Sequence, residues 1–217
     1  MIRNIIFDWS GTLVNDLPAV WNATNYVFEQ AGVNTMDLEQ FRKEFFLPFE
    51  DFYDIHTPGV SIEQLDKWYH EHFQKVIHSV EELPYARDFL KFCRNQEILT
   101  FLLSTIHPEH FRIQSEANRF HEYLDHPYVR ILNKKEKILE LIDHHELNPR
   151  ETLFIGDMVH DIETARQGKV HSCAVLTGYN QRAQLQEAEP DLIVEHLWEL
   201  QKILQKYELD LIQSWTK

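Results

Sequence analysis

Cysteine, glycine and basic residues are scarce in this chain of 217 residues, and no long hydrophobic run occurs in it. Cys93 and Cys173 stand too far apart in the sequence for a disulfide framework or a metal-binding spacing, so we expect two buried thiols in a reducing compartment. A membrane helix needs ~20 apolar residues, and no run approaches that length. The N-terminus also lacks the apolar stretch of a signal peptide. We therefore expect a cytoplasmic protein that makes no membrane contact.

The charge balance excludes further classes of partner. Lys and Arg together number 21 and Asp and Glu 35, which gives a net charge of −14. Without a basic run to follow a phosphate backbone, nucleic acid is a poor partner. With only 6 Gly and 8 Pro, a fibrous or disordered chain is also excluded. The length suits one domain, or one core that carries an inserted module.

Short, continuous apolar runs predict strands that are buried on both faces, as in a parallel sheet. Between them lie helix-length stretches with apolar residues three and four positions apart. This alternation predicts an α/β fold with a Rossmann-like parallel sheet. The expected strands are 4–7, 98–103, 152–155, 172–176 and 192–194, and the expected helices are 135–144, 163–167 and 197–207.

The stretch from Asp16 to Val80 differs from the rest of the chain. It has almost no strand signal and carries many aromatic residues at helical spacing, which we interpret as the core of a helical module. We therefore predict an α/β core formed by residues 1–15 and 81–217, interrupted by a helical domain at 16–80.

Three carboxylates follow expected strands. Asp8 ends the first apolar run, Asp157 follows the run 152–155, and Asp161 comes four residues later. A single Asp after a strand is usually a turn or helix-capping residue. The carboxyl ends of parallel strands share one sheet edge, however, where α/β proteins bind ligands. Grouped there, the three carboxylates would form an all-oxygen site of the kind that Mg²⁺ prefers.

Two further segments carry groups that suit an anion. Ser104 and Thr105 follow the run 98–103 and offer hydroxyl donors, although a helix-capping or turn role is the ordinary interpretation of Ser104. Lys134, Lys135 and Lys137 begin an expected helix, where lysines usually form a solvated face. One of them, turned toward Asp8 and Asp157, would offset the carboxylate repulsion.

Taken in this order, these segments resemble the haloacid dehalogenase (HAD) superfamily. Residues 5–13 (IIFDWSGTL) resemble its motif I, residues 101–104 (FLLS) motif II and residues 156–161 (GDMVHD) motif IV. Lys135 fits the single lysine of motif III, because Ile138 and Leu139 follow it at helical spacing, with Lys134 as the alternative. The expected helical module lies where this family carries a C1 cap. The resemblance covers nearly the whole chain and is closest to phosphoglycolate phosphatases.

The resemblance implies a role for each of these residues. Asp8 would attack phosphorus and form an aspartyl-phosphate. Mg²⁺ would be held by the side chains of Asp8 and Asp157 and by the backbone carbonyl of Ser10, with support from Asp161. The phosphoryl oxygens would be held by Ser104, Thr105 and the motif lysine, Lys135 or Lys134.

One position departs from the phosphatase pattern. Phosphatases of this family usually carry an acid-base Asp two residues after the nucleophile, where this chain has Ser10. A serine hydroxyl does not titrate near neutral pH, and loss of a positioned acid-base group costs typically ~10²–10⁴-fold in rate. At this motif alone, Asp8-Trp9-Ser10 most resembles the first residues of motif I in the phosphonoacetaldehyde hydrolases. Those enzymes also need a Schiff-base lysine, and only Lys43 lies near the expected place.

The sequence supports one leading hypothesis for the function and two alternatives. The favoured function is a Mg²⁺-dependent phosphatase for a small phosphorylated metabolite, slowed by Ser10. The second is a hydrolase of the same fold that breaks a C–P or C–halogen bond, and the third is a HAD-fold binding protein with little turnover. We expect a monomer or homodimer.

Overall fold

The computed structural model describes residues 1–211 of the chain, and residues 212–217, the end of the expected core segment 81–217, lie outside this range. Six strands form one sheet in the order β5-β4-β1-β6-β7-β8, and every neighbouring pair is parallel. The strands are β1 (Asn4–Phe7), β4 (Leu99–Leu103), β5 (His126–Tyr128), β6 (Thr152–Gly156), β7 (His171–Val175) and β8 (Leu192–Val194). The predicted α/β class with a parallel sheet is confirmed.

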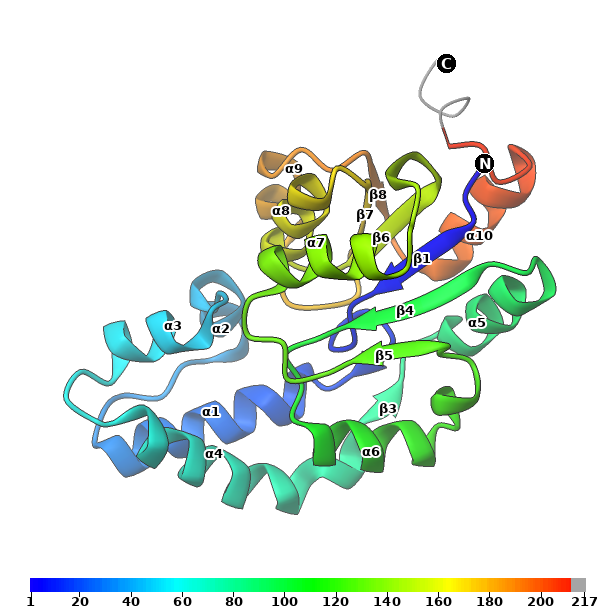
Figure 1. Cartoon of the computed structure of the whole chain (residues 1–217). Coiled ribbons are helices and arrows are strands. Elements are labelled where there is room, and N and C mark those ends of the chain that lie inside the picture. The colour runs from blue at the N-terminus through cyan, green and yellow to red at the C-terminus, as the bar shows by residue number, and fades with distance from the viewer. Residues whose placement is uncertain (212–217) are drawn as a thin grey trace.

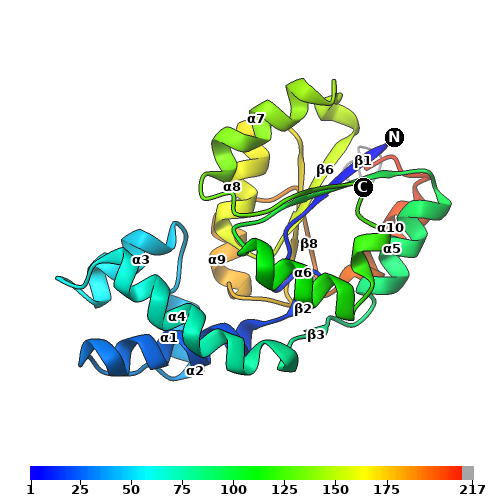
Figure 2. The ribbon, with the colours of Figure 1, turned by 60° about the horizontal axis from the view of Figure 1, so that its bottom comes forward.

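Helices cover both faces of the sheet. Side chains alternate along each strand, so these continuous apolar strands present hydrophobic side chains to both faces. Ile5 and Phe7 of β1 pack into one hydrophobic cluster together with α5, α6 and α10, whereas Ile6 packs into another with α7 and α8. Figure 2 shows the helices on the two sides of the sheet. These helices are α5 (Ala86–Asn95), α6 (Pro108–Ala117), α7 (Lys134–His144), α8 (Val159–Gly168), α9 (Arg182–Glu187) and α10 (Leu197–Lys206).

The elements assigned between Asp16 and Val80 are all helical, and we call residues 16–80 the helical segment. They are α1 (Leu17–Ala31), α2 (Leu38–Glu44), α3 (Phe49–His56), α4 (Ile62–Val76) and the 3-10 turn η1 (Ile77–Ser79). Its aromatic residues form a separate buried cluster, as expected for the core of a module. Met158 and Tyr179, which follow β6 and β7, join this cluster and so attach the segment to the sheet.

The helical segment lies beyond the carboxyl ends of the strands, toward which the arrows of β1 and β4 point in Figure 1. A two-stranded antiparallel ribbon, β2 (Val14–Asn15) with β3 (Glu81–Glu82), marks where the chain leaves the core and returns to it. Trp9 anchors the first of these crossings: it is fully buried, and its indole N–H donates to Gln114 Oε1 of α6 at 2.6 Å.

The structure contains elements that the sequence pattern did not predict. β5 pairs with β4 at the edge of the sheet and holds Pro127, which an edge strand tolerates because half of its backbone groups need no partner. Three residues with a proline carry too weak a pattern to be recognised as a strand. Within residues 1–211, each helix is too short or too polar to cross a lipid bilayer.

Candidate active site

Asp8 and Asp157 lie at the carboxyl edge of the sheet, directly after adjacent strands. Phe7 pairs with Ile155 across β1 and β6, and the Asp8 N–H donates to the Ile155 carbonyl at 2.9 Å. The order of the strands also reverses at β1, because the chain next forms β4 on one side and later β6 on the other. Ligands of open α/β sheets bind at such a switch point.

Lys134 links two of the three predicted carboxylates. Its Nζ donates to Asp8 Oδ1 at 2.6 Å and to Asp161 Oδ1 at 2.8 Å, and its side chain is 1% exposed. Burial alone would lower the pKa of Lys134, but the charges of Asp161 and Asp8 outweigh it and raise this pKa. The lysine is therefore held as a buried cation between two carboxylates.

The preference for Lys135 as the motif lysine is corrected by this geometry, and the alternative, Lys134, takes the position. Lys135 Nζ instead pairs with Glu163 of α8 at 2.7 Å, where its side chain is 44% exposed. Successive helix residues point in directions about 100° apart, so only one of two adjacent lysines can face the sheet edge. The buried positions of α7 are Lys134, Ile138 and Leu141, whereas Leu139, which favoured Lys135, is exposed.

Asp157 is fully buried and fixed by two donors. Thr12 Oγ1 donates to its Oδ1 at 3.2 Å, and the Tyr179 N–H donates to its Oδ2 at 2.7 Å. Burial, reinforced by the charges of Asp8 and Asp161, raises the pKa of Asp157 well above its usual value. Burial also raises the pKa of Asp8 to about 6, although Lys134 opposes the shift. More negative charge is gathered here than one lysine neutralises.

This donor set fits a magnesium ion. One oxygen each of Asp8, Asp157 and Asp161 lies within 4.8 Å of the others, and all three residues are buried. Mg²⁺ prefers carboxylate oxygen ligands and commonly uses one or two of them together with water. A cation here would offset the repulsion that raises the carboxylate pKa values. Asp161 also stabilises the start of α8, because its Oδ2 accepts from the Met158 N–H.

The two hydroxyl residues after β4 are placed differently from each other. Ser104 is buried, and its Oγ accepts from the Ile106 N–H at 3.3 Å. Thr105 is half-buried and lines the cavity that also contains Asp8. Ser104 thus stabilises the turn after β4, in agreement with its ordinary interpretation. β4 is paired with β1, so Ser104 lies near the residues that follow β1, and its contact with a phosphate stays a prediction.

Ser10 is hydrogen-bonded to a carboxylate that the sequence analysis did not single out. Its Oγ donates to Asp16 Oδ2 at 2.6 Å, and the Tyr179 hydroxyl donates to Asp16 Oδ1 at 3.1 Å. Burial raises the pKa of Asp16 to about 7, against the effect of these two hydrogen bonds. In the sequence, Asp16 stands directly before α1, where an Asp is typical of a helix start, so no pattern distinguished it.

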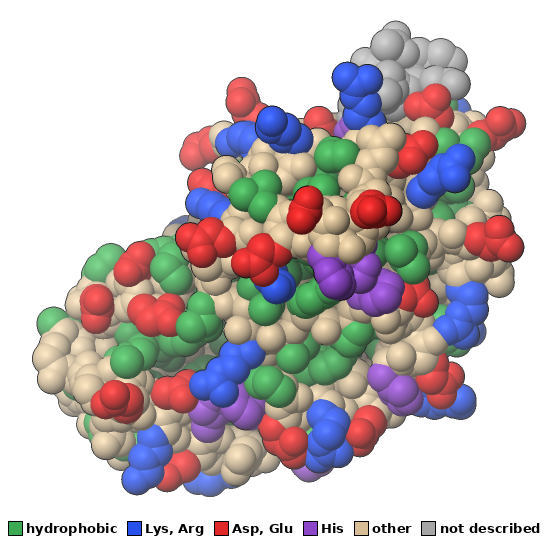
Figure 3. Space-filling model, in the orientation of Figure 1, with side chains coloured by type: hydrophobic (Ala, Val, Ile, Leu, Met, Phe, Trp, Pro, Cys, Tyr) green, Lys and Arg blue, Asp and Glu red, His purple; other side chains and the backbone are tan. Residues whose placement is uncertain are grey.

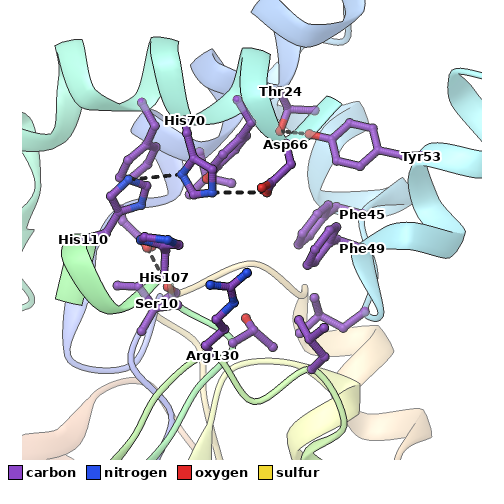
Figure 4. A pocket seen from close by; sticks show the side chains of 18 of the residues that line it. Ser10, Thr24, Phe45, Phe49, Tyr53, Asp66, His70, His107, His110 and Arg130 are labelled. Carbon is purple, nitrogen blue, oxygen red and sulfur yellow. Dashed lines mark hydrogen bonds and ion pairs between the residues drawn. The ribbon is translucent and has the colours of Figure 1, made fainter. Parts of the chain in front are cut away.

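A cavity of about 330 Å³ opens over Asp8 and Ser10 between the core and the helical segment. In the face shown in Figure 3, the surface is hollowed between these two parts, and hydrophobic side chains line the hollow. Figure 4 shows Phe45 and Phe49 on one side, a group of histidines on the other and the Arg130 guanidinium extending between them. The sequence analysis interpreted Phe45 and Phe49 as part of the core of the helical module. It did not single out Arg130 or the histidines, because they come from separate elements and form no local motif.

Gly11 offers a test of how tightly the site is packed. It has φ +72°, and a Cβ added to it would lie 2.5 Å from Asp157 Oδ2 and 2.7 Å from Gly178 Cα. We expect Gly11→Ala to lower the free energy of unfolding by about 2–4 kcal/mol, from left-handed strain and overpacking together. Urea denaturation would measure the change.

Gly32→Ala is the matched control for Gly11→Ala. Gly32 has the same φ of +72°, but nothing lies within 4 Å of its added Cβ, so only the strain of about 1–2 kcal/mol remains. An equal loss of stability in the two variants would show that Asp157 is not packed against Gly11.

Known proteins resemble this chain over nearly its whole length. The phosphoglycolate phosphatase of Synechococcus elongatus is 26% identical over 202 residues, which covers 89% of this chain and 93% of that protein. The pyrophosphatase PpaX of Bacillus cereus is 24% identical over 225 residues, with coverage of 94% and 96%. The predicted similarity to phosphoglycolate phosphatases is thereby confirmed.

Solved structures share the fold. A haloacid dehalogenase-like hydrolase from Streptococcus pneumoniae superposes with a TM-score of 0.81 at 23% identity, covering 94% of this chain and 98% of the other. A hydrolase from Pseudomonas syringae gives a TM-score of 0.80 at 17% identity, with coverage of 94% and 98%. The sequence profile of the haloacid dehalogenase-like hydrolases matches residues 5–175. The predicted membership is confirmed: this chain belongs to the haloacid dehalogenase-like hydrolase family.

Proposed function

We propose that this chain is a Mg²⁺-dependent phosphatase that hydrolyses small phosphate esters through an aspartyl-phosphate on Asp8. The observation that carries the proposal is the buried ion-pair network in which Lys134 Nζ contacts Asp8 and Asp161, with Asp157 beside them at the sheet edge. The relatives named as a phosphoglycolate phosphatase and a pyrophosphatase support the reaction class.

The residues at this sheet edge have different roles in the proposed reaction. The Asp8 carboxylate, of which one oxygen accepts from Lys134, attacks phosphorus with the other and displaces the leaving alcohol. Lys134 and the hydroxyl of Thr105 then stabilise the negative charge that spreads over the phosphoryl oxygens. Water then attacks phosphorus, which breaks the bond between phosphorus and the Asp8 oxygen, releases inorganic phosphate and restores the Asp8 carboxylate. Splitting the hydrolysis in this way replaces one difficult step with two easier ones.

Magnesium, held by Asp8 and Asp157 with Asp161 in support, would supply the positive charge that lets a carboxylate approach an anionic phosphate. The backbone carbonyl of Ser10 is a further ligand in this proposal. Thr12 and the Tyr179 N–H keep Asp157 oriented toward the cluster.

The helical segment acts as a cap in this proposal. Phe45, Phe49 and Tyr53 from α2 to α3 line the same cavity as Asp8, so the segment can exclude water from the phosphoryl group. A cavity of about 330 Å³ suits a small-molecule substrate. Because most of its wall comes from the segment, the choice of substrate falls to residues 16–80.

The phosphonatase alternative requires a cap lysine at the reaction site. Lys43 of α2 is 58% exposed and pairs with Glu39 at 3.0 Å, and it is not among the residues that line the cavity. This geometry favours phosphate ester hydrolysis over Schiff-base chemistry.

A panel of phosphorylated metabolites, assayed with and without Mg²⁺, tests the proposal. We expect turnover that requires Mg²⁺ and is lost in Asp157→Asn, with calorimetry showing a single Mg²⁺ site that this substitution weakens strongly. Mg²⁺ affinity that is equal in the variant and the native protein would remove Asp157 from the site. Absence of turnover with every substrate would favour the binding-protein alternative.

The nature of the leaving group tests the consequence of Ser10. Without a titrating acid at this position, an alkyl leaving group should depart slowly, whereas an aryl leaving group of low pKa needs little protonation. We expect alkyl phosphates to be hydrolysed about 10²–10⁴-fold less efficiently than in an enzyme with the acid. Ser10→Asp should accelerate alkyl phosphates selectively, as measured by kcat/KM for a matched aryl and alkyl pair.

Asp16 must be controlled in this experiment, because a new carboxylate at position 10 would face it. Ser10→Asp is therefore compared in the native background and with Asp16→Asn. Equal hydrolysis of alkyl and aryl phosphates by the native protein would mean that another group supplies the proton. Asp16, which contacts Ser10, would be the first group to replace.

A further inference from the structure

Three histidines from two distant parts of the chain meet in the wall of the cavity. His70 belongs to α4 of the helical segment, whereas His107 and His110 belong to the start of α6 in the core. One ring nitrogen from each lies within 4.8 Å of the others. Figure 4 shows the three rings turned toward one another, away from Phe45 and Phe49 across the cavity. The proposed phosphatase chemistry makes no use of these three histidines.

We propose that His70, His107 and His110 form a second metal site, for a divalent ion of the zinc class, that joins the helical segment to the core. The donor chemistry differs from that of the Asp8 cluster: imidazole nitrogens suit zinc and its neighbours, whereas Mg²⁺ prefers oxygen. Cys93 and Cys173 are buried elsewhere and do not contribute.

The spacing of two of the rings fits one ion. His70 Nδ1 lies 3.3 Å from His110 Nε2. Two nitrogen ligands at ~2.0–2.1 Å from a tetrahedral zinc lie about 3.4 Å apart, so an ion can replace the hydrogen bond between these rings with little movement. His107 completes three ligands through Nε2; binding there would place its ring proton on Nδ1 and break the long contact in which Nδ1 accepts from the Glu109 N–H at 3.3 Å.

The Asp66 carboxylate orients the His70 ring through the ring nitrogen that does not face His110. His70 Nε2 lies 3.1 Å from Asp66 Oδ1, one helical turn earlier in α4. Acceptance by Asp66 favours the tautomer with its proton on Nε2, so that the lone pair of Nδ1 faces His110. A carboxylate behind a metal-binding histidine is the usual arrangement of zinc sites, where it fixes the ring and raises its basicity.

The charged groups around the cluster permit a cation. Asp66 and Glu109 act on the histidines with negative charge and Arg130 with positive charge, while Glu109 is also paired with Arg112. Burial, together with the neighbouring rings, lowers the pKa of His110 and so favours its neutral form. Metal ions bind the neutral form of imidazole.

Three protein ligands would leave one position of a tetrahedral ion for water or another small ligand, and all three histidines line the cavity from which such a ligand would come. The ion would also link α4 to α6 directly. Binding should therefore hold the helical segment against the core, independently of whether the Asp8 site turns over substrate.

Cobalt absorption tests the site without any activity assay. The native protein is titrated with Co²⁺ in excess Mg²⁺, which occupies the carboxylate site, and visible absorption is recorded. We expect the intense bands of four-coordinate cobalt at one equivalent, their loss on addition of Zn²⁺, and slower amide exchange in α4 with Zn²⁺ bound. Asp157→Asn should keep the bands, which separates this site from the magnesium site.

Variants locate the ligands. His70→Gln and His107→Gln should lose the cobalt bands, and Asp66→Asn should weaken Co²⁺ binding by about 10–100-fold through the loss of ring orientation. His78→Gln, an exposed histidine two residues beyond α4, is the matched control and should bind as the native protein does. Weak, six-coordinate bands in the native protein, or bands that persist in both His70→Gln and His107→Gln, would overturn the proposal.

Discussion

Asp8→Asn is expected to abolish the hydrolysis of phosphate esters, with kcat lower by about 10⁴–10⁶-fold, because an amide oxygen cannot replace the attacking carboxylate. The substitution is isosteric, and the amide oxygen can still accept from Lys134, which contacts Asp8 Oδ1 at 2.6 Å. Lys134 keeps its second carboxylate partner, Asp161, at 2.8 Å, so its charge stays compensated in the variant. The melting temperature should therefore not fall.

Steady-state kinetics and thermal unfolding of the same preparation measure both effects. Asp143→Asn, on an exposed position of α7, is the matched control and should retain full activity. Turnover by Asp8→Asn at the native rate would mean that another group attacks phosphorus. The proposed aspartyl-phosphate would then be wrong even if the chain is a phosphatase.

Lys134→Met should destabilise the protein far more than the same substitution of the adjacent Lys135. Lys134 is buried between Asp8 and Asp161, and removing one partner of a buried ion pair costs about 3–5 kcal/mol, because it leaves charges uncompensated. Methionine keeps the length of the aliphatic chain, so the loss reports on the charge. We also expect kcat to fall by about 10²–10³-fold through the missing stabilisation of phosphoryl oxygens.

Lys135→Met controls for position in the helix and for the change of residue type. The pair of Lys135 with Glu163 lies at the surface, and such pairs contribute about 0–1 kcal/mol. Urea denaturation at neutral pH gives both values, and Mg²⁺ should restore part of the stability lost in Lys134→Met by replacing the missing positive charge. Equal losses in the two variants would contradict the assignment of Lys134.

Lys134 and Lys135 show how much of the site could be predicted from local sequence pattern. The sequence predicted a helix beginning near these residues and a lysine directed at the carboxylates, and α7 begins at Lys134. Choosing between adjacent residues requires the rotation of the helix about its axis. That rotation is set by the packing of Ile138 and Leu141 against the sheet, which four apolar residues within five positions of α7 do not reveal.

The carboxylate cluster was more accessible to sequence analysis. Asp8 and Asp157 each follow a strand that is buried on both faces, and such strands have continuous apolar runs. Parallel strands end at one edge, so both residues were expected at that edge. The strand order, in which β1 and β6 are neighbours, brings the two side chains together. Asp161 followed from its place in the first turn of the next helix.

The sequence by itself determined the α/β class, the position of the helical segment and the carboxylates at the sheet edge, because each is encoded by residues close together in the chain. Only the tertiary structure decided that Lys134 faces Asp8, that Asp16 accepts from both Ser10 and Tyr179, and that His70 meets His107 and His110. These contacts join elements far apart in the sequence. Their partners are selected by how helices pack on the sheet and on one another, and packing depends on the shapes of all the buried side chains at once.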